Sequence, residues 1–119
     1  MSIEITWLGH ASFRIAGHGT AVYIDPWKLA DEPHDADVVI VSHSHHDHCS
    51  PEDIAKASKD DTTLIAPTET LANLHAANGI GAGERVTINA ATVEAVAAYN
   101  IDKQFHPKAT GWLGFVVTL

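Results

Sequence analysis

The sequence predicts an α/β fold in which one mixed β-sheet carries helices on one of its faces. The chain opens with short segments that alternate apolar and polar residues, as half-buried strands do. A continuous apolar run over 36–41 is typical of a strand that is covered on both faces. Residues typical of helix starts, Ser50-Pro51 and Pro67-Thr68, then lie between the later strand-like segments. The resulting order, β-β-β-β-α-β-α-β-β-β, favours a layered α/β arrangement.

Three short strands are expected at the start of the chain, over 3–7, 12–15 and 21–24. Gly17–Thr20 reads as the turn between the second and third strands, and Asp25-Pro26 ends the third. Because the connections are this short, the three strands are predicted to form an antiparallel meander.

A helix is expected directly after the fourth strand and the histidine-rich segment that follows it. Ser50 can cap this helix, and Pro51 suits its first position. The acidic residues that come next favour the positive end of the helix dipole. The helix is predicted to run to about Ser58.

The second half of the chain predicts one more helix and four strands. A strand over 62–66 leads into a helix that begins at Pro67 and ends at Asn78-Gly79. The last three strands are expected at 85–88, 92–96 and 112–119, although 91–98 is also compatible with a helix.

Composition limits the class of protein. With 119 residues the chain is expected to form a single domain over 1–119, and its 45% hydrophobic content is typical of a globular protein. A net charge of −8 without a basic cluster argues against a nucleic-acid partner. No apolar run approaches a bilayer span, so no membrane partner is expected. The absence of a signal-peptide pattern and the single Cys49 predict a cytoplasmic protein.

Nine histidines are unusual for this length, and four of them lie within His43–His48. This segment contains the pattern H-x-H-x-D-H. His43 and His45 are two residues apart, so on an extended backbone both imidazoles point the same way. Asp47 and His48 lie where the chain must turn into the helix. Nitrogen ligands with one carboxylate suit Zn, or alternatively Mn or Fe, and a surface histidine tract is the plainer alternative.

Five segments of the sequence resemble the metallo-β-lactamase-fold metal-dependent hydrolases, in particular the branch of L-ascorbate-6-phosphate lactonase-like proteins. The segments are Trp7–Phe13, Ile24–Trp27, His43–His48, Ala98–Asn100 and Phe105–Lys108. The resemblance implies an α/β fold that is half of a metallo-β-lactamase αββα sandwich. It covers the whole chain and corresponds to the N-terminal half of the family fold.

The resemblance also implies a set of metal ligands. His43, His45 and a later histidine, His106, would hold a first ion, and Asp47 with His48 would contribute to a second. One or two ions per chain are therefore expected. Asp47 is the candidate catalytic residue, because it can orient the nucleophile or transfer its proton. A surface position beside Pro107 is the alternative for His106.

Two further residues are candidates for the same site. His10 would lie near the metals and contact substrate, or serve as a structural hydrogen-bonding group. Asp25 would be a hydrogen-bond partner of a ligand histidine, or form a turn with Pro26.

Members of the family are nearly twice as long as this chain, and their bridging aspartate and C-terminal ligand histidine have no counterpart here. Apolar strands such as Val38–Val41 and Phe115–Val117 are therefore expected to need cover from outside the chain. A two-fold homodimer, in which each chain supplies the missing half, is the prediction.

The resulting prediction is a metal-dependent hydrolase that acts on ester, lactone or phosphodiester bonds of a small-molecule substrate. The alternative is a metal-binding structural half-domain, whether a fragment, a designed chain or an ancestral-like one, with little or no turnover. An RNA-processing nuclease of the same fold is disfavoured by the net charge of −8.

Overall fold

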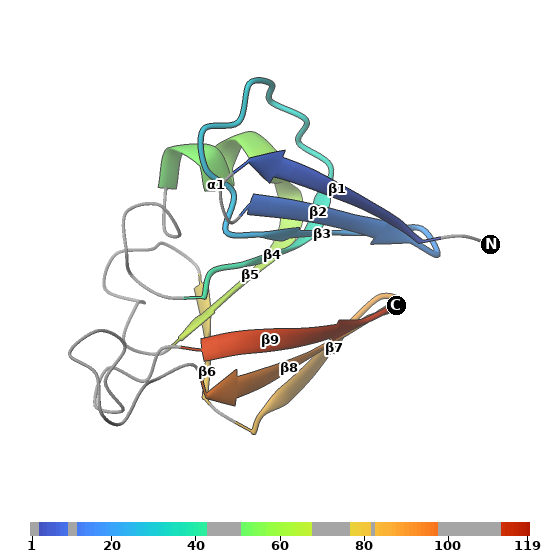
Figure 1. Ribbon diagram of the computed structural model, residues 1–119, viewed down its shortest axis with the longest axis vertical. Coiled ribbons are helices and arrows are strands. Elements are labelled where there is room, and N and C mark those ends of the chain that lie inside the picture. The colour runs from blue at the N-terminus through green and yellow to red at the C-terminus, as the bar shows by residue number, and fades with distance from the viewer. Residues whose placement is uncertain (1–2, 10–11, 43–50, 68–76, 82, 98–112) are drawn as a thin grey trace.

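The computed structural model describes residues 3–9, 12–42, 51–67, 77–81, 83–97 and 113–119 of the chain. These residues form nine strands and one helix in the described ranges, arranged in layers (Figure 1). The elements are β1 (Glu4–Gly9), β2 (Ser12–Gly17), β3 (Thr20–Ile24), β4 (Ala36–Ile40), α1 (Pro51–Ala57), β5 (Ser58–Pro67), β6 (Ala77–Ile80), β7 (Arg85–Ile88), β8 (Ala91–Ala97) and β9 (Leu113–Thr118).

The first six strands form a mixed sheet in the order β1-β2-β3-β4-β5-β6. β1, β2 and β3 are antiparallel neighbours, which confirms the predicted meander. β3, β4, β5 and β6 are parallel neighbours. The carboxyl ends of these parallel strands therefore lie along one side of the sheet, which we call the carboxyl edge.

The last three strands form a second, antiparallel sheet in the order β7-β8-β9, where the sequence predicted a single sheet. A tight turn separates the two sheets: Gly83 has φ +86°, and the Glu84 amide donates to the Gly81 carbonyl at 3.0 Å. This turn redirects the chain after β6. β8 then buries Ala91, Val93 and Ala95 while the residues between them stay more exposed, so its apolar face packs against the first sheet.

One hydrophobic core lies between the two sheets. It joins residues of β3–β6 to residues of β8, namely Val22, Val38, Ile40, Ile65, Ile80, Ala91, Val93 and Ala95, and Phe115 and Val117 of β9 pack against it. A second core, including Val39 and Val41, packs against Ile54 and Ala57 of α1. All four residues Val38–Val41 are fully buried by the chain itself. The expectation that Val38–Val41 need cover from outside the chain is therefore wrong, whereas Phe115 and Val117 are only partly buried and Val116 is 50% exposed.

The predicted helix after the histidine segment is present as α1, which ends one residue before Ser58. The second predicted helix is wrong at its end, because Ala77–Ile80 form β6; residues 68–76 lie outside the described residues. β6 pairs in parallel with β5, and Ile80 is 2% exposed in the core, so sheet pairing overrides the local helix signal. Residues 91–97, which were compatible with either element, form a strand paired on both sides.

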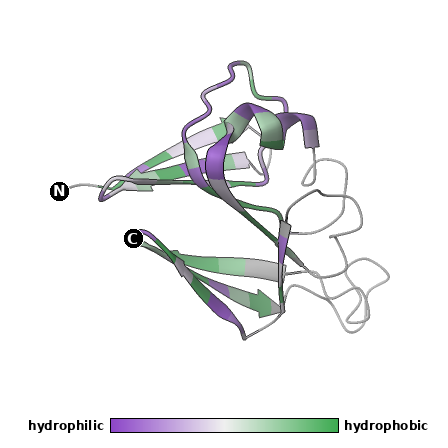
Figure 2. Ribbon diagram, turned by 180° about the vertical axis from the view of Figure 1, so that it is seen from behind, coloured by the Kyte–Doolittle hydropathy of each residue, from purple (hydrophilic) through white to green (hydrophobic). Residues whose placement is uncertain are grey.

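Hydrophobic residues run along the strands of both sheets, whereas the connection between β3 and β4 is mostly hydrophilic (Figure 2). No helix in the described part of the chain is long and apolar enough to cross a membrane.

The face of the first sheet that carries the inter-sheet core continues over β1 and β2, where large apolar side chains are exposed. Trp7 pairs with Phe13, and Phe13 pairs with Ile24, which packs against that core. Ile3, Ile5, Trp7 and Phe13 are 47%, 67%, 66% and 36% exposed. We call these four residues the inner-face patch.

Candidate metal centre

The structure describes one of the predicted site residues, Asp25, together with Gly9 before His10 and with Ser42 and Pro51 on either side of the segment 43–50. The remaining predicted residues lie outside the described residues: His10, His43, His45, Asp47, His48 and His106. In the described ranges, no three His, Cys, Asp or Glu side chains lie together so that they could hold a metal ion. His18 and His34 are exposed.

The residues that flank the histidine motif lie at the carboxyl edge of the first sheet. β4 ends at Ile40, and the Val41 amide continues the ladder by donating to the Ile65 carbonyl at 2.9 Å. Ser42 is the last residue before the motif, and Pro51 opens α1 after it. In open α/β sheets, ligands bind beyond the carboxyl ends of parallel strands. Ser42 therefore leads into the motif from the usual place for a binding site.

Asp25 fixes the chain at the residue directly before His43. Its side chain is buried, and its Oδ1 accepts a hydrogen bond from the Ser42 amide at 2.7 Å. Its Oδ2 accepts a second hydrogen bond from Ser42 Oγ, also at 2.7 Å. Hydrogen bonds to a carboxylate are stronger than those between neutral groups. We call this arrangement the Asp25–Ser42 clamp.

The backbone of Asp25 explains how the carboxylate reaches Ser42. Asp25 has φ +46°, a left-handed conformation that Asp tolerates better than most residues, and its amide donates to the Ile40 carbonyl at 2.8 Å. The turn-forming alternative for Asp25 is thus present in the structure. Its hydrogen bond to a ligand histidine stays a prediction.

Asp53 holds the other side of the histidine segment. The sequence suggested only a helix-dipole role for this residue, but its buried carboxylate accepts hydrogen bonds from the Lys28 amide at 2.8 Å and the Leu29 amide at 2.9 Å. Lys28 has φ +55°, which marks a turn in the β3–β4 connection. The Asp53 carboxylate stabilises this turn through its two hydrogen bonds. The segment between Ser42 and α1 therefore begins and ends at anchored residues.

Ser12 is a polar residue at this edge that sequence reasoning missed. Its side chain is fully buried, and Ser12 Oγ has no hydrogen-bond partner in the part of the chain that the structure describes. Phe13 pairs with Ile24, so Ser12 lies next to the position of Asp25 in the adjacent strand. Its place in the Trp7–Phe13 segment that carries the family resemblance was the available signal.

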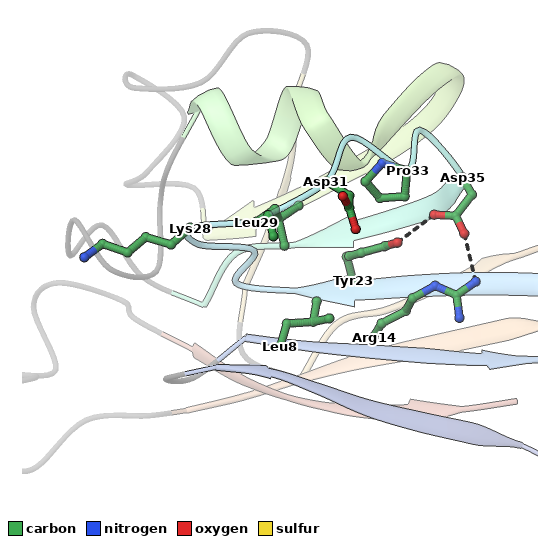
Figure 3. Close-up of a pocket in the computed structure, with 9 residues that line it drawn as sticks. Leu8, Arg14, Tyr23, Lys28, Leu29, Asp31, Pro33 and Asp35 are labelled. Carbon is green, nitrogen blue, oxygen red and sulfur yellow. Dashed lines mark hydrogen bonds and ion pairs between the residues drawn. The ribbon is translucent and has the colours of Figure 1, made fainter.

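A separate pocket of about 390 Å³ lies against β1–β3 beneath the β3–β4 connection (Figure 3). Asp35 lies at one end, where its carboxylate accepts from Tyr23 Oη at 2.6 Å and from Arg14 Nη2 at 2.8 Å. The Arg14 guanidinium also lies 5.8 Å from the centre of the Tyr23 ring. Asp35 directly precedes β4, so this network stands at the opposite end of β4 from Ser42.

The network shifts the pKa values of its members. Burial, and then the hydrogen bond and negative charge of Asp35, raise the pKa of Tyr23 to about 12. Burial alone would raise the pKa of Asp35, but hydrogen bonds from Tyr23 and Arg14 and the charge of Arg14 outweigh it, and the pKa is lowered. These polar groups satisfy one another, which identifies the network as a structural tie between the β3–β4 connection and the sheet.

Comparisons with known proteins define the class. The family described as the beta-lactamase superfamily domain matches residues 4–119. A UPF0173 metal-dependent hydrolase from Nitratidesulfovibrio vulgaris (strain DP4) is 30% identical over 138 residues, covering all of this chain and 55% of that protein. The chain thus belongs to the beta-lactamase superfamily, and it is similar to proteins named as metal-dependent hydrolases.

Solved structures agree with this fold. A structure named as a metal-dependent hydrolase from Parabacteroides distasonis superposes with a TM-score of 0.88 at 27% identity, over 98% of this chain and 56% of that one. CmlA, a diiron β-hydroxylase from Streptomyces venezuelae, superposes with a TM-score of 0.75 at 16% identity, over 98% of this chain and 27% of that one, which shows the fold alone.

The chain spans about half the length of the curated relatives that it matches along its whole length. The narrower resemblance to L-ascorbate-6-phosphate lactonase-like proteins is not tested by these relatives and stays a prediction.

Proposed function

We propose that this chain binds a catalytic metal ion through its histidine motif and contributes to the hydrolysis of ester, lactone or phosphodiester bonds in small molecules. The observation that carries the proposal is the Asp25–Ser42 clamp. It fixes the residue before the H-x-H-x-D-H motif at the carboxyl edge, in a chain that belongs to a family of metal-dependent hydrolases.

The proposed ligands are His43, His45 and His106 for one ion, with Asp47 and His48 contributing to a second. Three imidazoles leave a fourth position of a tetrahedral ion open, which is the usual arrangement of a catalytic zinc site. The buried and unpartnered Ser12 hydroxyl beside Asp25 is consistent with a polar group being bound at this edge.

A bound metal ion would supply Lewis acidity, lowering the pKa of water and polarising the scissile carbonyl or phosphoryl group. The Asp47 carboxylate would orient the attacking water and accept its proton. His10 would hydrogen-bond the substrate, and Asp25 would support a ligand histidine.

Zn is the proposed metal, with Mn or Fe as alternatives, because imidazole and carboxylate ligands accept all three. CmlA, which has the same fold, is a diiron protein, so iron is a specific competitor in the test.

Metal content and hydrolysis test the proposal together. Protein purified without chelator is expected to carry one or two transition-metal ions per chain in native mass spectrometry. It is also expected to hydrolyse at least one compound in a panel of a nitrophenyl ester, a lactone and bis(nitrophenyl) phosphate. His45→Ala should remove most of the metal, whereas His18→Ala, which changes an exposed histidine outside the motif, should not. Full metal content in the His45 variant would contradict the site.

The second candidate is a metal-binding half-domain without turnover. Asp47→Ala separates the two functions. Under the hydrolase proposal this variant keeps part of its metal and loses hydrolysis. If the wild-type chain binds metal and hydrolyses none of the panel, the half-domain function replaces the proposed one.

We also propose that the chain associates as a homodimer through the inner-face patch. Apolar residues exposed to this extent on adjacent strands are typical of surfaces that are covered in an assembly. Trp7 and Phe13 are neighbours across β1 and β2, so one partner surface can cover both. A two-fold arrangement of identical patches is the simplest closed assembly.

A further inference from the structure

Ser12 differs from the other hydroxyl side chains whose hydrogen bonds are known in the described part of the chain. Thr62 Oγ1 donates to the Ala36 carbonyl, Ser58 Oγ donates to the Ile54 carbonyl, and Ser42 Oγ donates to Asp25. Ser12 is 0% exposed, yet its Oγ has no partner among the described residues.

A buried hydroxyl without a partner costs free energy, because it loses its hydrogen bonds to water and gains none in return. An alanine at this position would avoid that cost and fill nearly the same space. A serine here is therefore unfavourable for the stability of the chain alone, and such groups call for a functional explanation.

The position of Ser12 indicates what its partner is. The residue opens β2 and pairs with Gly9, and the register of β2 with β3 places it beside Asp25. Asp25 in turn holds Ser42, the residue before the histidine motif. Ser12 therefore lies one strand away from the clamp that presents the proposed metal ligands.

We propose that Ser12 is a positioning residue of the metal centre, whose Oγ accepts the ring N–H of a metal-bound imidazole. A histidine that binds a metal through one ring nitrogen carries a hydrogen on the other, and this N–H needs an acceptor that fixes the orientation of the ring. A hydroxyl oxygen can accept such a bond. This inference rests on the proposed metal site, and it assigns Ser12 no contact with the substrate.

Ser12→Ala tests the proposal by separating metal affinity from stability. The variant is expected to bind zinc about 10–100-fold more weakly than the wild type, as measured by competition with a chromophoric chelator. The metal-free variant should unfold at the same or a higher urea concentration, since alanine removes the unpaired hydroxyl. Loading with Co²⁺ alone should give a changed visible absorption spectrum, because the orientation of an imidazole ligand is altered.

Ser58→Ala is the matched control, since its hydroxyl donates to the Ile54 carbonyl at 2.7 Å at the end of α1. This variant should lose stability without metal and keep wild-type zinc affinity. Equal zinc affinity in the Ser12 variant and the wild type would overturn the inference. So would a loss of affinity of the same size in the Ser58 variant.

The proposed metal site and the proposed role of Ser12 are contradicted by different results. If the wild-type chain does not bind zinc, Mn²⁺ or Fe²⁺, the proposed metal site is contradicted, and the role of Ser12 falls with it. If the wild type binds zinc and Ser12→Ala binds it equally well, the metal site stands and the positioning role alone is wrong.

Discussion

Asp25 links two strands at the point where the chain leaves the sheet for the histidine motif. Its amide donates to the Ile40 carbonyl, and its carboxylate accepts from both the amide and the hydroxyl of Ser42. Because the side chain is buried, these hydrogen bonds are shielded from competition with water. A single residue thus holds Ser42, the last described residue before the motif.

Asp25→Ala is expected to lower the free energy of unfolding by about 2–4 kcal/mol, because two hydrogen bonds to a buried carboxylate are lost. Asp25→Asn should lose about half as much, since the amide oxygen still accepts from the Ser42 amide and Asn tolerates positive φ. Urea unfolding at neutral pH measures both changes. An alanine variant as stable as the wild type would show that the clamp is not needed for folding.

The hydrogen bonds between Tyr23, Arg14 and Asp35 add a pH dependence to stability. A pKa raised to about 12 means that the folded state keeps the Tyr23 proton that the unfolded chain releases near pH 10.0. This contribution is complete below pH 10.0 and is lost as the pH rises towards 12. For Asp35 the pKa is lowered, so its contribution is present above the ordinary value of 3.8 and is lost as the pH falls below it.

Tyr23→Phe is expected to lower the free energy of unfolding by about 1.5–3 kcal/mol at neutral pH, because the hydrogen bond to the Asp35 carboxylate is removed. The difference in stability between the variant and the wild type should then shrink as the pH rises from 10.0 to about 12. Urea unfolding at a series of alkaline pH values measures this difference. A difference that is independent of pH would contradict the shifted pKa of Tyr23.

At the scale of elements, α1 and the β3–β4 connection depend on each other. α1 has seven residues and contributes Ile54 and Ala57 to the core beneath it. A helix this short gains little stability from its own backbone hydrogen bonds, so it relies on contacts with its surroundings. The Asp53 carboxylate supplies such a contact by binding the amides of Lys28 and Leu29.

Asp53→Ala is expected to lower the free energy of unfolding by about 2–4 kcal/mol, since two backbone amides lose a charged acceptor. Glu52→Ala is the control on the preceding position of the same helix. The Glu52 side chain is 84% exposed and lies 3.9 Å from Lys56, so its removal should change stability by at most about 0.5 kcal/mol. Equal losses in the two variants would contradict the anchoring role of Asp53.

At the scale of the whole molecule, the inter-sheet core covers β3–β6, whereas the inner face of β1 and β2 remains exposed. Val38 and Ile40 are fully buried between the sheets, while Ile5 and Trp7 on the same face are about two-thirds exposed. The chain thus completes its central core and leaves an apolar surface beside it. This surface, and not the central strands, is where association is expected.

Trp7→Lys is expected to convert the proposed homodimer to a monomer, because a lysine in the inner-face patch would be buried without a partner charge. Light scattering after gel filtration should give twice the 12.7 kDa chain mass for the wild type and the single chain mass for the variant. Val116→Lys is the matched control: Val116 is 50% exposed on β9 and pairs with Glu94, which can compensate the new charge. A wild-type mass of 12.7 kDa at high micromolar concentration would overturn the dimer.

Most of the local structure was determined by the sequence, because it depends on neighbouring residues. Alternation and turn residues predicted β1–β3 and their antiparallel order, and Pro51 predicted the start of α1. The histidine motif indicated a metal site without any structure, because its residue types and spacing suit metal binding, and the family resemblance implied a hydrolase. The match over 4–119 confirms the family resemblance.

Only the tertiary structure decided which segments pair and what each polar side chain binds. The helix predicted to end at Asn78-Gly79 gave way to β6 at Ala77, because pairing with β5 buries Ile80 in the core. The separate β7–β9 sheet and its cover over Val38 depend on contacts between residues distant in sequence. The same holds for Asp25 with Ser42, 17 residues apart, and for Asp53 with Leu29, 24 residues apart. Such partners are brought together by folding, and no local pattern specifies them.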